Sequence, residues 1–251
     1  MTISFMELFH PLDVDVFREH FDNNRCLVVE GQTEKFLDLV TAQDIERRLN
    51  DGCNFSLAAQ IIQDGSRRSL VDADTCWSPS SLQKAEFLKA VRGGSSFMLP
   101  NASQVTPAIA QFIDEMEHFF IDEKVHADVH LYISTQSHGN SYYAHRDYPQ
   151  HKLLLQAVGD TKWTIYQAKP DIPDNLIALN SEQEQEWLEP MSEFVLRQGD
   201  LLYMPPATFH KVKGLEGARL SISIPFYSNP HANQMDRTFI PFTDIFQQEG
   251  N

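Results

Sequence analysis

A His-x-Asp pair followed at a distance by another histidine is the feature of this sequence best suited to metal chemistry. His145 and Asp147 are separated by one residue, and His210 follows 63 residues after Asp147 (210 − 147), inside GDLLYMPPATFHKV. Two imidazoles and one carboxylate can hold Fe(II) on one side and leave other coordination positions open for reactants. Residues two apart on a strand share a face, so His145 and Asp147 can point into one site. We therefore predict that these three residues bind a metal ion.

The sequence around the three residues is typical of a β-rich structure. Residues 128–135, DVHLYIST, alternate apolar and polar side chains with the period of a strand. Further strands are predicted over residues 152–158, 162–167, 193–198, 200–205 and 218–226. One helix is expected over 181–191, where Ser181 and Glu184 resemble a capping box. Many short strands separated by turns favour a double-sheet jelly-roll core.

The first part of the chain has a mixed pattern in which helices dominate. Helices are predicted over residues 13–24, 41–52, 78–94 and 106–120, and strands over 25–31 and 95–101. Thr106 and Pro107 form a typical helix start. Residues 54–63 fit a strand, with a helix as the alternative. We predict one mainly β domain over 1–251, with a helical part (1–94), a jelly-roll core (95–226) and a C-terminal tail (227–251).

Composition restricts the classes of partner. The net charge of the 251 residues is −15, which argues against binding to nucleic acid or to an anionic membrane, because phosphate groups attract basic surfaces. No window approaches about 20 apolar residues, so no membrane span is expected. Three scattered cysteines are typical of reduced thiols, and the N-terminus lacks signal-peptide features, so a cytoplasmic protein is expected.

Three stretches of the sequence resemble a known family. VHLYISTQSHGNSYYAHRD, LLLQAVGDTKWTIYQ and VLRQGDLLYMPPATFHKV are similar to the JmjC-type cupin oxygenases, most closely to their ribosomal-oxygenase (cupin-4-like) branch. The resemblance spans about residues 95–226. It implies a double-stranded β-helix in which His145, Asp147 and His210 bind Fe(II), with 2-oxoglutarate as co-substrate and O2 as oxidant. It also implies a hydroxylase or demethylase that releases succinate and CO2.

The position that binds the distal carboxylate of 2-oxoglutarate departs from the family pattern. The family usually places Lys or Arg two residues after the glycine of the turn, but here Thr161 occupies that position and Lys162 follows it. We predict that Lys162 binds the co-substrate, which requires a bulge at Gly159–Asp160 because alternate strand residues point to opposite faces. Other side chains able to contact this carboxylate are Lys152, Arg219 and Ser221.

Several functions remain open from the sequence alone. The substrate could be an amino-acid side chain in a protein or peptide, or a small molecule. One alternative is a metal-binding cupin with chemistry that does not use 2-oxoglutarate, and another is a catalytically silent JmjC-like binding protein. A zinc hydrolase is least favoured, because no second carboxylate is placed as a general base. The ribosomal branch carries C-terminal dimerisation segments, whereas only about 25 residues follow Phe226 here. A claim about oligomeric state that depends on those segments does not transfer, and whether the protein forms a homodimer remains open.

Overall fold

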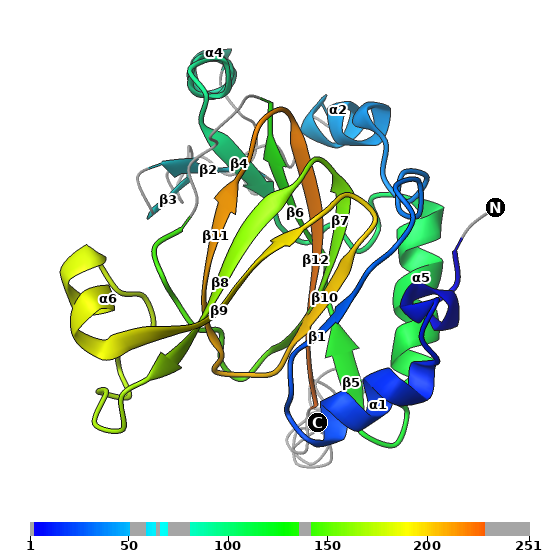
Figure 1. Ribbon diagram of the computed structural model, residues 1–251. Helices are drawn as coiled ribbons and strands as arrows, with labels where there is room; N and C mark the ends of the chain where they lie inside the picture. The colour runs from blue at the N-terminus through cyan, green and yellow to red at the C-terminus, as the bar shows by residue number, and fades with distance from the viewer. Residues whose placement is uncertain (1–2, 51–58, 64–65, 70–80, 136–141, 229–251) are drawn as a thin grey trace, which may run out of the picture.

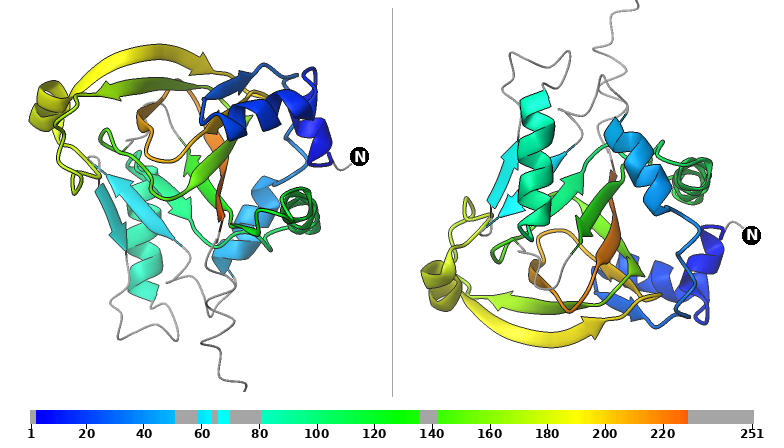
Figure 2. Two further views of the ribbon diagram at one scale, coloured as in Figure 1. Left: turned by 90° about the horizontal axis from the view of Figure 1, so that it is seen from below. Right: turned by 90° about the horizontal axis from the view of Figure 1, so that it is seen from above.

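Two antiparallel sheets face each other in the computed structural model, which describes residues 3–50, 59–63, 66–69, 81–135 and 142–228 (Figure 1). The large sheet has the order β1 (Leu27–Val29), β10 (Leu201–Met204), β7 (His151–Val158), β12 (Arg219–Ser228), β6 (His130–Ser134), β4 (Ser96–Leu99), β2 (Gln60–Gln63), β3 (Ser66–Ser69), with β5 (Val125–Ala127) beside β12. The small sheet has the order β11 (Phe209–Gly214), β8 (Thr161–Ala168), β9 (Leu188–Leu196). Figure 2 shows β8 and β9 arching over the large sheet. This arrangement confirms the predicted jelly-roll core.

The helices lie outside the two sheets. They are η1 (Met6–Phe9), α1 (Val14–Asp22), α2 (Ala42–Asn50), α4 (Ser81–Arg92), α5 (Pro107–Phe119) and α6 (Ser181–Trp187). α5 begins where the sequence predicted, because the Thr106 hydroxyl accepts a hydrogen bond from the Ile109 amide at 3.1 Å and Pro107 occupies the first turn. No helix among the described residues is long and apolar enough to cross a membrane.

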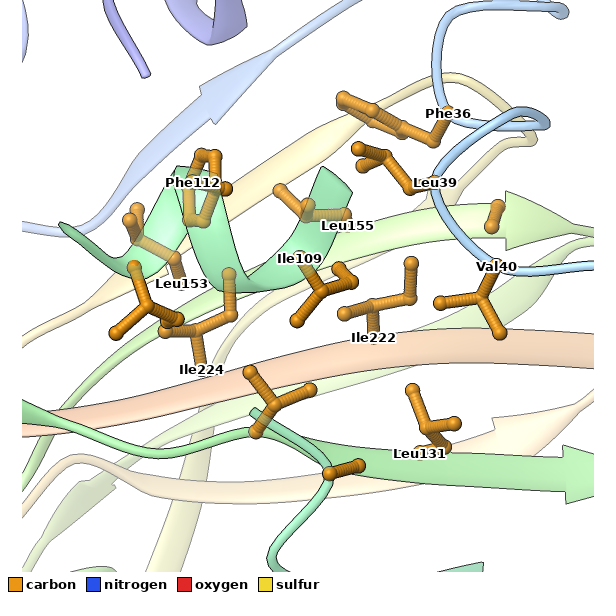
Figure 3. Packing of buried hydrophobic residues seen from close by; sticks show 14 of the residues in the cluster. Phe36, Leu39, Val40, Ile109, Phe112, Leu131, Leu153, Leu155, Ile222 and Ile224 are labelled. Carbon is orange, nitrogen blue, oxygen red and sulfur yellow. The ribbon is translucent and has the colours of Figure 1, made fainter. Parts of the chain in front are cut away.

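The central strands of the large sheet have two different faces. On β7 and β12 the outward rows are aliphatic or aromatic and pack against α5, as Figure 3 shows for Leu153, Leu155, Ile222 and Ile224 around Ile109 and Phe112. Burying one such side chain contributes roughly 1.5–3 kcal/mol, so this layer holds the helices on the sheet. The inward row of β12 is polar and consists of Arg219, Ser221 and Ser223. The space between the sheets therefore has a polar wall.

The strands predicted within 25–31 and 54–63 are present as β1 and β2, and they extend the core sheet, because β1 pairs with β10 and β2 pairs with β4. The structure corrects two details of the helix predicted over 181–191. The capping box of α6 lies one residue earlier than predicted, since the extended Asn180 caps the amide of Gln183 and Gln183 caps Asn180 in return. The predicted helix over 181–191 ends at Trp187, because Leu188 begins β9 in register with β8.

Candidate metal centre

The two predicted histidine ligands face each other through a pair of backbone hydrogen bonds. His145 N donates to His210 O at 3.0 Å, and His210 N donates to His145 O at 2.8 Å. Residues paired in this way across antiparallel segments present their side chains on the same face. The two imidazole centroids lie 4.3 Å apart. His210 belongs to β11, a strand that the sequence analysis did not predict.

Asp147 completes a three-residue cluster with these histidines. Its Oδ2 lies 3.7 Å from His210 Nε2 and 4.0 Å from His145 Nε2. The potential ligand atoms of the three residues all lie within 4.8 Å of one another. The backbone of Asp147 is held by the amide of Ala207, which donates to its carbonyl at 2.8 Å. The structure thus brings the three predicted ligands together.

Hydrogen bonds to backbone carbonyls orient both imidazoles. His145 Nδ1 lies 2.9 Å from the carbonyl oxygen of Tyr143, and His210 Nδ1 lies 2.9 Å from that of Thr208. A carbonyl oxygen only accepts hydrogen bonds, so the proton of each neutral ring is on Nδ1. The Nε2 atoms of His145 and His210 then lie on the side of Asp147, where imidazole lone pairs serve as metal ligands. The chemistry of this donor set fits Fe(II).

Burial and neighbouring charges keep Asp147 and His210 deprotonated. Burial alone would raise the pKa of Asp147, but the positive charge of Lys152, whose Nζ lies 2.5 Å from Oδ2, and the nearby imidazoles outweigh it and lower this pKa. Burial lowers the pKa of His210 well below its ordinary value, and His145 and Lys152 act in the same direction. Metal ions bind carboxylates and neutral imidazoles, so Asp147 and His210 are in the forms that a metal ion requires.

A pocket with about 510 Å³ of empty space, part of it open to solvent, lies beside the two imidazoles and between the two sheets. Its lining includes both imidazoles and a set of aromatic, hydroxyl and basic side chains: Tyr132, Tyr142, Lys152, Trp163, Arg219, Ser221 and Ser223. Trp163 stacks on His210 with ring centroids 5.7 Å apart. The pocket combines an apolar wall with two cations, which suits a small anionic molecule.

The two residues predicted to bind the co-substrate lie in different places. Ser221 is buried in the pocket wall and donates to Gln156 Oε1 at 2.9 Å. Lys162 lies on the outer face of β8, where its side chain is 43% exposed and pairs with Glu193 at 2.9 Å. β8 pairs with β11 in unbroken register from Thr161 to Tyr166, and because Thr161 is buried, the next residue, Lys162, points to the opposite face. The structure therefore contradicts the role predicted for Lys162.

The sequence prediction missed the role of Gln156, a fully buried amide in the middle of β7. Its Oε1 accepts from Thr161 Oγ1 at 3.1 Å and from Ser221 Oγ at 2.9 Å, and its Nε2 donates to the carbonyls of Val158 and Gly159. This side chain ties β7, β8 and β12 together behind the pocket. The signal in the sequence was one amide inside the apolar run LLLQAV.

Known proteins share this architecture. The structure of the ribosomal oxygenase YcfD from Escherichia coli, in complex with cobalt and 2-oxoglutarate, superposes with a TM-score of 0.59 and 18% identity, covering 96% of this chain and 58% of that one. Another structure of E. coli YcfD gives a TM-score of 0.58 at 17% identity, covering 96% and 59%. At these identities the likeness shows a common fold.

Sequence relatives lead to the same family. The "Bifunctional lysine-specific demethylase and histidyl-hydroxylase NO66" of Drosophila mojavensis is 26% identical over 214 residues, 81% of this chain and 22% of that protein. The Drosophila erecta protein of that name is 26% identical over 245 residues, 93% and 35% respectively. The chain thus spans between a fifth and about a third of the length of these relatives. A family model described as the JmjC domain matches residues 98–235, more than half of the chain, and the chain therefore belongs to the JmjC domain family.

Proposed function

We propose that this protein is an Fe(II)- and 2-oxoglutarate-dependent oxygenase that hydroxylates an amino-acid side chain of a protein. The observation that carries the proposal is the cluster of His145, Asp147 and His210, whose potential ligand atoms lie within 4.8 Å of one another beside a pocket lined by Lys152 and Arg219. The names of the relatives support it, since NO66 is called a histidyl-hydroxylase and YcfD a ribosomal oxygenase found with cobalt and 2-oxoglutarate.

The three ligands would hold the iron on one side, and the pocket would hold 2-oxoglutarate on the other. Iron, O2 and 2-oxoglutarate together supply the oxidant: substrate R–H, 2-oxoglutarate and O2 give R–OH, succinate and CO2. The carbonyls of Tyr143 and Thr208 fix the orientation of the imidazoles. Trp163 covers one face of His210 and keeps water from that side.

The outer rim of the site suits a polypeptide substrate. Tyr143 and Tyr148 flank the ligand segment and are exposed, and Ile177, whose carbonyl accepts from the Arg146 amide, is exposed beside them. Exposed aromatic and aliphatic side chains at the mouth of a site offer contact area to a peptide. The net charge of −15 favours a basic partner, such as a ribosomal protein. These features support a protein substrate over a small molecule.

The proposal is tested by coupled turnover on peptides. The protein is loaded with Fe(II) under anaerobic conditions and mixed with 2-oxoglutarate, O2 and a panel of basic peptides that contain histidine or lysine. We expect succinate release that depends on one class of peptide, with a mass gain of one oxygen atom on that peptide. His145→Ala is the control and should release no peptide-dependent succinate.

Three outcomes would favour other functions. Metal binding without any 2-oxoglutarate binding would favour a metal-binding cupin with different chemistry. Binding of metal, 2-oxoglutarate and peptide without turnover would favour a silent JmjC-like binding protein. Loss of a methyl group as formaldehyde, rather than retention of the added oxygen, would identify a demethylase.

A further inference from the structure

Arg219 is a buried cation without an anionic partner among the residues that the structure describes. Its side chain lines the pocket and the residue is 7% exposed. Its Nε is buried and has no hydrogen-bond partner, and no ion pair joins it to a described residue. The groups that favour its charged form are the hydroxyls of Tyr132 and Tyr142, and neither belongs to a carboxylate. An isolated buried charge is costly, so a partner is expected to come from outside the chain.

The other basic side chains near the pocket are already engaged. Lys152 is paired with Asp147 at 2.5 Å, next to the metal cluster. Lys162 is paired with Glu193 on the outer face of the small sheet. These pairings leave Arg219 as the cation that can accept a new carboxylate inside the described part of the pocket.

Thr161, at the position where the family resemblance implied a basic residue, offers no charge to a ligand. Thr161 is fully buried; its hydroxyl donates to Gln156 Oε1 at 3.1 Å and accepts from Trp163 Nε1 at 2.9 Å. Its hydrogen-bonding capacity is used inside the protein, and it carries no charge. A ligand carboxylate therefore gains no ion pair from β8.

The inner row of β12 offers the charge that β8 lacks. Arg219 and Ser221 are two residues apart on one strand and line the same pocket. A guanidinium can bind both oxygens of a carboxylate at once. The Ser221 hydroxyl now donates to Gln156 Oε1, which also accepts from Thr161, so Gln156 stays satisfied if Ser221 turns to a ligand.

We propose that Arg219, assisted by Ser221, binds the distal carboxylate of 2-oxoglutarate, so that β12 rather than β8 anchors the co-substrate in this chain. The proposal rests on the proposed function, because it names the residue that selects the dianionic keto acid at the same site. It also assigns a separate role to each of the two cations in the pocket: Lys152 pairs with the metal ligand Asp147, and Arg219 binds the distal carboxylate.

The test compares two keto acids that differ only at the distal group. 2-Oxopentanoate has the carbon chain of 2-oxoglutarate with a methyl group in place of the distal carboxylate. Both are titrated calorimetrically into Co(II)-loaded protein without O2, so that binding is measured in place of turnover. The wild type should bind 2-oxoglutarate on the order of 100-fold more tightly than 2-oxopentanoate, because an unpaired buried guanidinium is left with the latter.

Arg219→Met should remove this preference to within about threefold and leave Co(II) affinity unchanged, whereas Arg219→Lys should restore part of it. Lys162→Met is the matched control and should keep the full preference. A full preference in folded Arg219→Met would overturn the assignment while leaving the proposed function intact. Failure of the Co(II)-loaded wild type to bind either keto acid would overturn both.

A second measurement keeps the assignment testable if Arg219→Met does not fold. Co-crystals of the wild type with Co(II) and 2-oxoglutarate should place the distal carboxylate within hydrogen-bond distance of the Arg219 guanidinium. A distal carboxylate bound instead by Lys152 would refute the assignment.

Discussion

Replacing Arg219 should make the ligand-free protein more stable, although it removes a large buried side chain. Burial lowers the pKa of Arg219 from its ordinary value to about 10, even though Tyr132 and Tyr142 act in the opposite direction. A pKa difference of this size means that keeping the group charged inside the fold costs about 3 kcal/mol. Methionine has a similar length, fills the space with an apolar chain and carries no charge.

The expected net effect of Arg219→Met is a gain of about 2 kcal/mol in the free energy of unfolding, since some of the relief is offset by lost contacts with the two tyrosines. For a domain of this size, that gain raises Tm by roughly 4–8 °C. The assay is urea unfolding of EDTA-treated protein, followed by circular dichroism. Lys162→Met, which removes an exposed ion pair, is the control and should change stability by less than about 0.5–1 kcal/mol.

Adding Co(II) and 2-oxoglutarate should make the wild type more stable than Arg219→Met. At 2-oxoglutarate concentrations about 100 times Kd, the wild type gains about 2.7 kcal/mol from ligand binding, whereas Arg219→Met gains little beyond the effect of the metal. A clear loss of stability in ligand-free Arg219→Met would refute the reasoning, because it would show that Arg219 is stabilised by partners within the fold.

Three further changes test other parts of the structure. Asp147→Ala should abolish Co(II) binding in equilibrium dialysis and destabilise the fold by about 1–3 kcal/mol, because Lys152 loses its carboxylate. Gly199→Ala should cost more than about 2 kcal/mol in urea unfolding, since φ is +95° and the added Cβ would lie 2.1 Å from Gln32 O. Burial lowers the pKa of His151 to about 4, so between pH 6.5 and 4 the unfolded chain binds more protons than the folded protein. The stability of the wild type therefore decreases as the pH is lowered through this range. His151→Gln should reduce the loss between pH 7 and 5 by about 1 kcal/mol, after allowance for partial exposure.

Local sequence determined the elements whose signals lie within a few residues. α5 follows from Thr106, Pro107 and a helical stripe of apolar residues, and the structure confirms it. The paired faces of β12 follow from the alternation in RLSISIPF, since a strand turns successive side chains to opposite sides. The grouping of His145 with Asp147 follows from the same period of two, and the order of the motif indicated that His210 would join them.

Tertiary structure decided which cation faces the pocket. From sequence, Lys162 and Arg219 were both candidates, and Lys162 was preferred for its place beside the family position. Its direction depends on the register of β8 against β11, which is unbroken and turns it outward. Register arises from pairing between residues about 50 positions apart, such as Lys162 with Lys213, and a one-residue slip reverses every side chain. Such pairings depend on how the sheets close on each other, so the face that Lys162 presents was fixed only by the assembled fold.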